Sequence, residues 1–384
     1  MITQAMGRVT LEFSLKAWAR ERRFDEDTVR TVAERLWSNW ERLCERADEL
    51  AVMLWVGDGS ELFHWHGSLD DSFPYAHSVG FCNYKTPDAF PPDNRHYRVN
   101  AAVPFMENPP QLTYRHLRDI ISALRMAARQ RWGREILVGA TIDPGPEFVE
   151  NDWKFTEHPE ILVPQARRRF PRMMHFITHQ ASFHADHHDY AAFPEGLPEA
   201  TPLGIFLGRQ FEHMRHVLGY DFVWFSNGFG YSHCPWGWQG ELIDLEGFHP
   251  ERAERQRNQC NAFWRDFREA CPEAPVEVRG TNFSVGMDLA SDGCSHADIF
   301  EIGGLHRPPC NPPWGSRALG LEMTSFLSRI AKSPTDRILM RFYLNDPWFN
   351  SMPWEDYYGR EPFDLYIPLS ASRLNSDGTV TAPT

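Results

Sequence analysis

The chain has 384 residues, of which 39 are basic and 52 acidic, so its formal net charge is −13. A chain of this length forms either one large decorated domain or two domains. The acidic balance argues against nucleic acid and anionic membranes as partners, because binding to phosphates needs a basic face. Aromatic residues make up 14% of the chain and include 14 Trp, which indicates a very aromatic core, a binding surface of flat rings, or both.

The seven cysteines are dispersed and show no CxxC spacing, a pattern typical of reduced thiols in a cytoplasmic protein. The first residues lack a charged segment followed by an apolar stretch, so no signal peptide is expected. No apolar run approaches the ~18 residues of a membrane-spanning helix. We therefore expect a cytoplasmic protein. The sequence does not indicate its oligomeric state.

Strand-like and helix-like segments alternate along the chain. Residues 9–13 alternate apolar and polar side chains as a strand does, and 27–50 carry an apolar helical stripe. Residues 50–56 form a continuous apolar run, which suits a strand buried on both faces. The elements expected after these are strand 97–105, a helix from cap Thr113 to Gly133, strand 136–142, helix 202–218 between cap Thr201 and Gly219, strand 220–225, helix 250–270, strands at 276–278 and 297–302, helix 314–331 and strand 337–344.

These segments give eight strand candidates with helices between them, which is the count of a (β/α)8 TIM-like barrel. Neither 58–95 nor 282–296 contains a convincing helix, so long loops are expected there. An open doubly wound sheet is the main alternative, but no glycine-rich phosphate turn follows the first strand. We expect the barrel to occupy residues 1–345, followed by an aromatic extension and a linker-like tail at 346–384.

Polar residues follow the expected strands at the points where a barrel carries its active site. Five of the eight strand ends supply a carboxylate, usually amid Gly, Asn and Trp. The candidate catalytic residues are Asp143, Glu147, Asp288 and Glu301, and the candidate substrate-binding residues are Trp55, Asp58, Asn227, Trp236, Arg279, Asn282, Asp346 and Trp348. Two carboxyl groups can cleave a glycosidic bond, while Asp, Asn and Arg bind sugar hydroxyls and Trp stacks on sugar rings.

Each of these residues also has a purely structural interpretation. Residues 143–146 (Asp-Pro-Gly-Pro) can form a tight turn without any catalytic role. Trp55 lies within an apolar run, which is more typical of a core residue than of a sugar-stacking platform. Asp288 and Asp292 can cap a short helix.

The segment 175–188 is rich in histidine and suggests a metal site. His175 and His179 have helical spacing, while His184 and His188 alternate with Asp186 as residues of a strand do. Imidazoles with carboxylates suit zinc or a similar ion. No HExxH or other tight motif occurs, so a polar lid with exposed histidines is the other interpretation, and we assign no metal ligand.

At its strand ends the chain resembles the broad superfamily of TIM-barrel glycoside hydrolases, over about residues 8–345. The largest clan of retaining barrel enzymes has Asn-Glu after strand four and Glu after strand seven; here Glu301 ends expected strand seven, but Ile142-Asp143 ends strand four. A second clan, which includes many α-galactosidases, has Asp after strands four and six. This resemblance implies Asp143 as nucleophile and Asp288 as general acid/base, with Glu147 and Glu301 as substitutes.

Three functions remain open at this point. The first is a glycoside hydrolase that acts on an oligosaccharide or glycoside and needs no cofactor. The second is a metal-dependent sugar isomerase, epimerase or hydrolase that uses the histidine-rich segment. The third is a carbohydrate-binding protein without catalysis.

Overall fold

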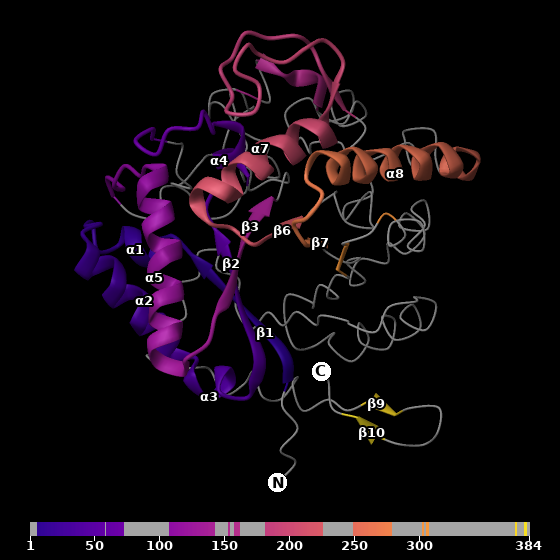
Figure 1. Cartoon of the computed structure of the whole chain (residues 1–384). Helices are drawn as coiled ribbons and strands as arrows, with labels where there is room; N and C mark the ends of the chain where they lie inside the picture. The colour runs from indigo at the N-terminus through magenta and orange to yellow at the C-terminus, as the bar shows by residue number, and fades with distance from the viewer. Residues whose placement is uncertain are drawn as a thin grey trace, which may run out of the picture.

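The computed structural model shows an α/β protein built on a parallel sheet (Figure 1). It describes residues 6–57, 59–72, 107–142, 153, 157–161, 181–225, 249–278, 302, 305–306, 373–374 and 380–381. Every structural statement below refers to these residues.

Five strands form the body of the sheet, in the order β1-β2-β3-β6-β7, and the two-residue β8 follows at its edge. Every pairing in it is parallel. The strand order therefore follows the chain without a reversal. The bounds are β1 (Met6–Ser14), β2 (Ala47–Trp55), β3 (Ile136–Ile142), β6 (Phe222–Phe225), β7 (Val276–Val278) and β8 (Leu305–His306).

The expected strands near residues 9, 51, 137, 221 and 276 are confirmed, whereas 97–105 and 337–344 lie outside the described residues. β2 pairs directly with β3, from Leu50 opposite Ile136 to Leu54 opposite Ala140. No strand from 97–105 therefore lies between them, and β3 is the third strand of the sheet, not the fourth.

Most of the expected strand at 297–302 lies outside the described residues, and Glu301 lies outside them too. Ile302, the one described residue of this range, lies in a turn. The described strand β8 begins three residues later.

Four long helices cover one face of the sheet: α2 (Glu26–Asn39), α5 (Tyr114–Trp132), α7 (Leu203–Leu218) and α8 (Ala253–Ala270). They pack in chain order, α2 on α5, α5 on α7 and α7 on α8 (Figure 1). This is the arrangement expected when parallel neighbours are joined by right-handed crossovers. Shorter helices are α1 (Lys16–Ala19), α3 (Glu41–Cys44) and α4 (Ser60–Phe63).

Local signals set most of the helix ends. The Thr113 side chain accepts from the His116 backbone amide at the start of α5, and Gly133 ends this helix in the left-handed conformation, both as expected. Gly219 ends α7 in the same way. Thr201 does not cap α7, because Pro202 occupies that position and the Thr201 hydroxyl donates to the Pro198 carbonyl instead.

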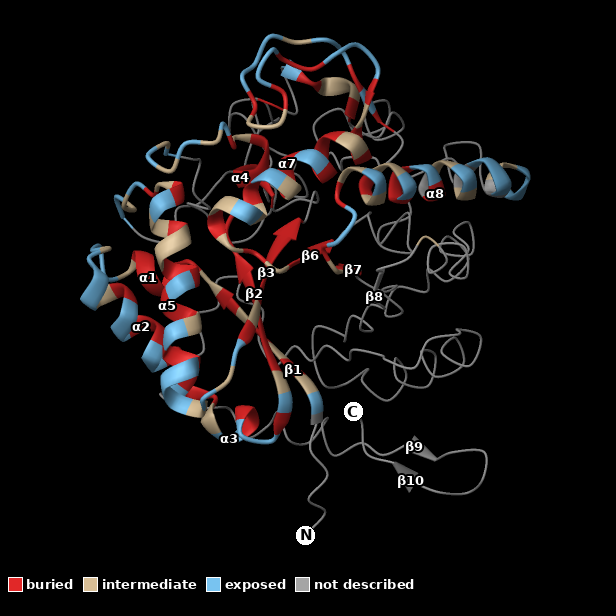
Figure 2. Ribbon diagram, in the orientation of Figure 1, coloured by how far each residue is buried: buried red, intermediate tan, exposed pale blue. Residues whose placement is uncertain are grey.

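The two faces of the sheet differ in character. On the face covered by the helices, which we call the helix face, Leu50, Val52 and Leu54 of β2 join the main apolar core. Figure 2 shows the strands buried and the outer surfaces of the helices exposed. The opposite face, which we call the inner face, carries the alternate residues. On β1 these are the polar residues Arg8, Thr10, Glu12 and Ser14.

The sheet is strongly curved toward its inner face. Arg8 of β1 and Glu277 of β7 form an ion pair of 2.9 Å between Nη2 and Oε1, although three strands separate β1 from β7. Four strand spacings amount to about 19 Å in a flat sheet, beyond the combined reach of these two side chains. The Arg8 guanidinium also lies 5.0 Å from the centre of the Phe222 ring on β6. These contacts require β1 and β7 to face each other.

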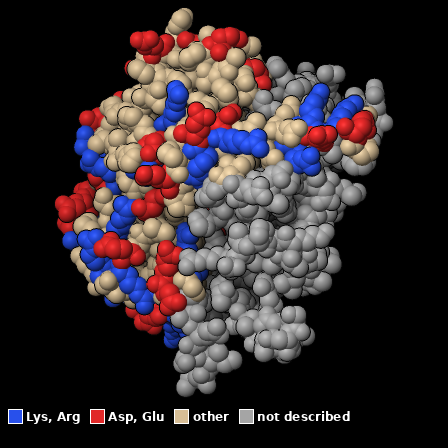
Figure 3. All heavy atoms as spheres, turned by 45° about the vertical axis from the view of Figure 1, so that its right-hand side comes forward, with Lys and Arg blue, Asp and Glu red and all other residues tan. Residues whose placement is uncertain are grey.

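Two observations concern the surface and the thiols. On the face drawn in Figure 3, acidic and basic side chains are interspersed over the described residues. Among those residues, no helix is both long and apolar enough to cross a membrane. Cys44 and Cys271 are buried and form no disulfide.

The tail expected to be linker-like contains a small hairpin. β9 (Arg373–Leu374) pairs antiparallel with β10 (Val380–Thr381), and Asp377-Gly378 lies in the sequence between them. Such a pair of residues favours tight hairpin turns.

A double-mutant cycle on Arg8 and Glu277 tests the curvature. Burial raises the pKa of Glu277, Arg8 counteracts this, and Glu49 and Glu12 add to it. Arg8→Met leaves the carboxyl group without its cation, so we expect it to lower the free energy of unfolding by about 3–5 kcal/mol. The double variant with Glu277→Leu should lose much less than the sum of the two single variants.

The measurement is urea unfolding of the four proteins at neutral pH. The exposed pair Arg129 and Glu135 is the matched control, and its coupling should stay below about 1 kcal/mol. Strictly additive losses for Arg8 and Glu277 would contradict the inner-face contact.

Candidate functional site

Glu12 and Trp55 meet on the inner face near the carboxyl ends of the strands. The Trp55 indole Nε1 donates to Oε2 of Glu12 over 3.2 Å. Its ring meets that of Trp224 on β6 edge to face, with centroids 5.4 Å apart. Trp55 is 2% exposed, whereas Glu12 is partly exposed. A carboxylate thus stands beside two aromatic rings at the edge where parallel strands present functional groups.

Glycine on β3 allows large rings to occupy this face. A Cβ atom added to Gly139 would overlap the Phe222 ring, which lies across β3 at this point. Met53 and Phe222 are the register partners of Gly139 on the neighbouring strands. The missing side chain therefore provides the space into which the β6 aromatic residue extends.

The turn after β2 is held by a buried carboxylate. Oε2 of Glu61 accepts from the backbone amides of Gly57 (3.0 Å) and Gly59 (3.1 Å), the residues on either side of Asp58. Gly59 has a φ of +102°, which favours glycine, and a Cβ there would lie 3.2 Å from Cγ2 of Ile142 at the end of β3. Burial raises the pKa of Glu61 from 4.5 to about 7, although its amide donors act in the opposite direction.

Of the residues expected to form the site, the structure describes Trp55. It is buried and in contact with Trp224, as its place in an apolar run suggested, and it also binds a carboxylate. The other expected residues, namely Asp58, Asp143, Glu147, Asn227, Trp236, Arg279, Asn282, Asp288, Glu301, Asp346 and Trp348, lie outside the described residues.

The clan resemblance depends on the position of each strand in the sheet, and two of these positions differ from the expected ones. Asp143 directly follows β3, the third strand of the sheet, and Asp288 comes after β7, the fifth. The resemblance had placed them after strands four and six. The strand before Asp143 and the strand before Asp288 each move down by one place in the strand order. The two residues therefore still follow strands that are two places apart.

Sequence reasoning missed Glu12. We interpreted residues 9–13 only as an alternating strand, and an alternating strand normally turns its polar side chains to water. The signal was nonetheless present, since a strand whose neighbours are continuous apolar runs lies in a buried sheet. Polar residues on such a strand face the interior of the molecule, where each needs a partner.

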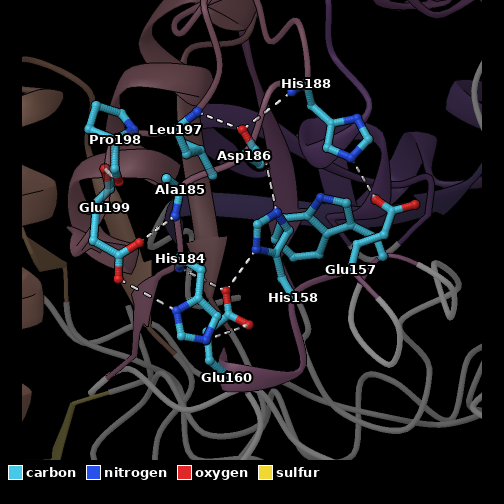
Figure 4. Close-up of polar contacts among 12 residues, drawn as sticks. Glu157, His158, Glu160, His184, Ala185, Asp186, His188, Leu197, Pro198 and Glu199 are labelled. Carbon is cyan, nitrogen blue, oxygen red and sulfur yellow. Dashed lines mark hydrogen bonds and ion pairs between the residues drawn. The ribbon is translucent and has the colours of Figure 1, made fainter.

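A second polar cluster lies in the segments 157–161 and 181–200 (Figure 4). His158 is 2% exposed and lies between two carboxylates, with Nδ1 2.7 Å from Oε1 of Glu160 and Nε2 3.0 Å from Oδ2 of Asp186. The two carboxylates therefore hold the buried imidazole ring from both sides.

Asp186 joins this cluster to the neighbouring backbone. It accepts from the amide of Leu197 (2.6 Å) and from the hydroxyl of Tyr190 (2.8 Å), which in turn accepts from Nε1 of Trp153 (3.1 Å). Burial would raise the pKa of Asp186, but its donors from Leu197, Tyr190 and His158 outweigh burial and hold the pKa below 3.8. The carboxylate therefore fixes the fold of the segment.

Two exposed histidines of this segment, His184 and His188, are paired with carboxylates. His184 lies 3.6 Å from Glu199 and 3.9 Å from Glu160, and His188 lies 3.0 Å from Glu157 (Figure 4). Within the described residues, no group of three His, Cys, Asp or Glu side chains is arranged to hold a metal ion. His175 and His179 of the metal hypothesis lie outside them.

Comparisons of the sequence with protein-family models and with curated proteins give no match. The functional argument therefore depends on the residues and their geometry.

Replacing Asp186 tests whether it fixes the fold of this segment. Asp186→Asn removes the charge that His158 and three other donors share, so we expect a loss of about 1–3 kcal/mol and faster proteolysis within 181–200. Glu199→Gln is the control, because Glu199 is exposed and Gln keeps an acceptor for the Ala185 amide; its effect should stay within about 0.5 kcal/mol. Equal effects of the two substitutions would refute the assignment.

Proposed function

We propose that the chain is a (β/α)8-barrel glycoside hydrolase whose site lies at the carboxyl edge of the parallel sheet. The observation that carries the proposal is the contact of Glu12 with Trp55 beside Trp224, a carboxylate among aromatic rings on the inner face at that edge. Sugar recognition uses this combination, because carboxylates accept from hydroxyl groups and flat rings cover the C–H faces of the sugar.

The barrel is supported by the order and curvature of the strands. A doubly wound sheet reverses its strand order at a switch point, whereas this order runs from β1 to β8 without reversal. In a barrel, the side chains of alternate strands fill the interior in layers. Arg8 and Glu277 come from the first and fifth strands of the sheet, which are both odd-numbered in its order. Trp55 and Trp224 come from the second and fourth strands, which are both even-numbered. Each of these two contacts therefore joins strands of the same alternate set.

Three of the candidate catalytic and substrate-binding residues closely follow strands of this sheet in the chain. Asp143 comes directly after β3 and Arg279 directly after β7, while Asn227 comes two positions after β6. Because parallel strands end at one edge, the chain leaves the sheet beside the Glu12–Trp55 pair at each of these points. We assign Asp143 as nucleophile or base and Asp288 as general acid, with Glu147 as a substitute. Glu301 is a second substitute.

In the proposed reaction, one carboxylic acid gives its proton to the leaving oxygen. The other carboxylate attacks the anomeric carbon or activates a water molecule that does so. Glu12 and Trp55 bind the sugar next to the bond that breaks. The described part of the histidine-rich segment uses its carboxylates on imidazoles and backbone amides, so the geometry does not favour the isomerase hypothesis.

A panel of aryl glycosides and oligosaccharides tests the function. We expect turnover of at least one member, and a loss in kcat of about 10²–10⁴-fold in both Asp143→Asn and Asp288→Asn with sugar binding retained. Asp27→Asn on the exposed surface of α2 is the control and should leave kcat unchanged. Chelators should have no effect. Absence of turnover across the panel, or full activity of both variants, would overturn the proposal.

Trp55→Phe tests the pair that carries the proposal. The substitution keeps a ring and removes the donor to Glu12, so we expect kcat/KM to fall by about tenfold or more through a misplaced carboxylate. Trp37→Phe is the matched control: it removes an indole donor to the Leu124 carbonyl on the helix face. It should lower stability without changing kcat/KM. Identical kinetic effects of both variants would assign Trp55 to the core alone.

A further inference from the structure

Three residues of the inner face carry buried polar atoms that form no hydrogen bond within the described part of the chain. These atoms are Nε of Arg8, Oγ1 of Thr10 and Oε1 of Glu277. Glu277 is the most enclosed of the three, with 4% of its side chain exposed where it meets Arg8. Native proteins give nearly every buried polar group a partner, so three such atoms on one face call for an explanation.

The ion pair between Arg8 and Glu277 does not use the hydrogen-bonding capacity of its atoms. Nη2 of Arg8 lies 2.9 Å from Oε1 of Glu277, which brings the charges together, but the contact lacks the alignment of a hydrogen bond. The guanidinium also lies against the Phe222 ring, 5.0 Å from its centre. A donor of Arg8 and an acceptor of Glu277 therefore stand close to each other, and each lacks a hydrogen-bond partner among the described residues.

Thr10 lies between this ion pair and Glu12. Arg8, Thr10 and Glu12 are alternate residues of β1, so their side chains follow one another along the inner face at intervals of about 6.7 Å. Opposite Thr10 on β2 is Ala51, whose side chain has no polar atom. We call Arg8, Thr10, Glu12 and Glu277 the inner strip. Glu12 is partly exposed and 13% of the Arg8 side chain is exposed, so solvent reaches the inner strip.

The charges of the inner strip favour a neutral ligand. Burial is the main cause of the raised pKa of Glu277, and the charges of Glu49 and Glu12 add to it, so these carboxyl groups lie near one another. They would repel an anion, and Arg8 would repel a cation. A hydroxyl group both donates and accepts. One hydroxyl group of a ligand can accept from Nε of Arg8 and donate to Oε1 of Glu277, and another can pair with Thr10.

We propose that the inner strip is a binding subsite for the hydroxyl groups of a neutral sugar, in which Arg8, Thr10 and Glu277 bind the ligand next to Glu12. Bound hydroxyl groups give each of the three buried atoms its partner. The proposal rests on the proposed function only in taking a sugar as the ligand. It adds the substrate class, a neutral sugar in preference to a uronic acid, and it adds three binding residues on β1 and β7.

Thr10→Val separates ligand binding from folding. The two side chains have nearly the same shape, and replacing a buried hydroxyl group that has no partner costs no stability. We therefore expect the variant to unfold at the wild-type urea concentration or a higher one. Its affinity for a neutral sugar should fall about tenfold, because one hydrogen bond to the ligand is lost.

Calorimetric titration of the full chain measures the affinities, with glucose, galactose and mannose as neutral probes and glucuronate and galacturonate as acidic ones. We expect at least one neutral sugar to bind, and more tightly than either acidic one. Thr201→Val is the matched control, because the Thr201 hydroxyl donates to the Pro198 carbonyl over 2.7 Å. This variant should unfold at a lower urea concentration and keep the wild-type affinity for the sugar.

Absence of binding by all three neutral sugars, tighter binding of a uronate, or unchanged affinity in Thr10→Val would overturn the proposal. Clear destabilisation of Thr10→Val would also overturn it, because the hydroxyl group would then have a partner in the free protein. Binding that weakens in Thr10→Val without turnover of any glycoside would remove the hydrolase and leave the subsite. Turnover with unchanged sugar affinity in Thr10→Val would remove the subsite alone.

Discussion

An arginine and a glutamate face each other across the inner side of a parallel sheet, and the geometry of the molecule depends on this contact. Arg8 and Glu277 come from strands that only strong curvature can bring together. Once the sheet is curved, its helices lie outside and its alternate side chains converge inside. The curvature also lets residues of three strands meet on the inner face, where Trp55 contacts both Glu12 and Trp224.

The strands therefore serve two purposes with alternate residues. One set, represented by Leu50, Val52 and Leu54, supplies the apolar core under the helices. The other set carries charge and large rings inward, and some of its polar members have partners, as Glu12 has in Trp55. The cluster around His158, outside the sheet, is also built from buried polar contacts, in which carboxylates accept from imidazoles and backbone amides. Stability and the candidate site thus share one framework of buried polar contacts.

Sequence patterns predicted the α/β class, five strands of the sheet and the caps Thr113 and Gly133, because continuous apolar runs and cap residues act over a few neighbouring positions. These patterns gave wrong predictions where the position or contact of a residue depends on partners outside its own local pattern. The pairing of β2 with β3 changed the strand ranks, and Thr201 used its hydroxyl in the preceding turn. Glu12, Glu61 and His158 were not singled out, since a lone polar residue shows its burial only after folding.

The order of the strands also bears on how the molecule folds. The strands pair in chain order, but register partners such as Leu50 and Ile136 lie far apart in the sequence, and such long-range parallel pairing folds slowly. The ion pair of Arg8 with Glu277 joins the first strand to the fifth and must wait until the strands between them are in place. Such a late contact contributes little to the folding barrier and mainly slows unfolding. The residues that curve the sheet would then set the lifetime of the native state, and not the speed at which it forms.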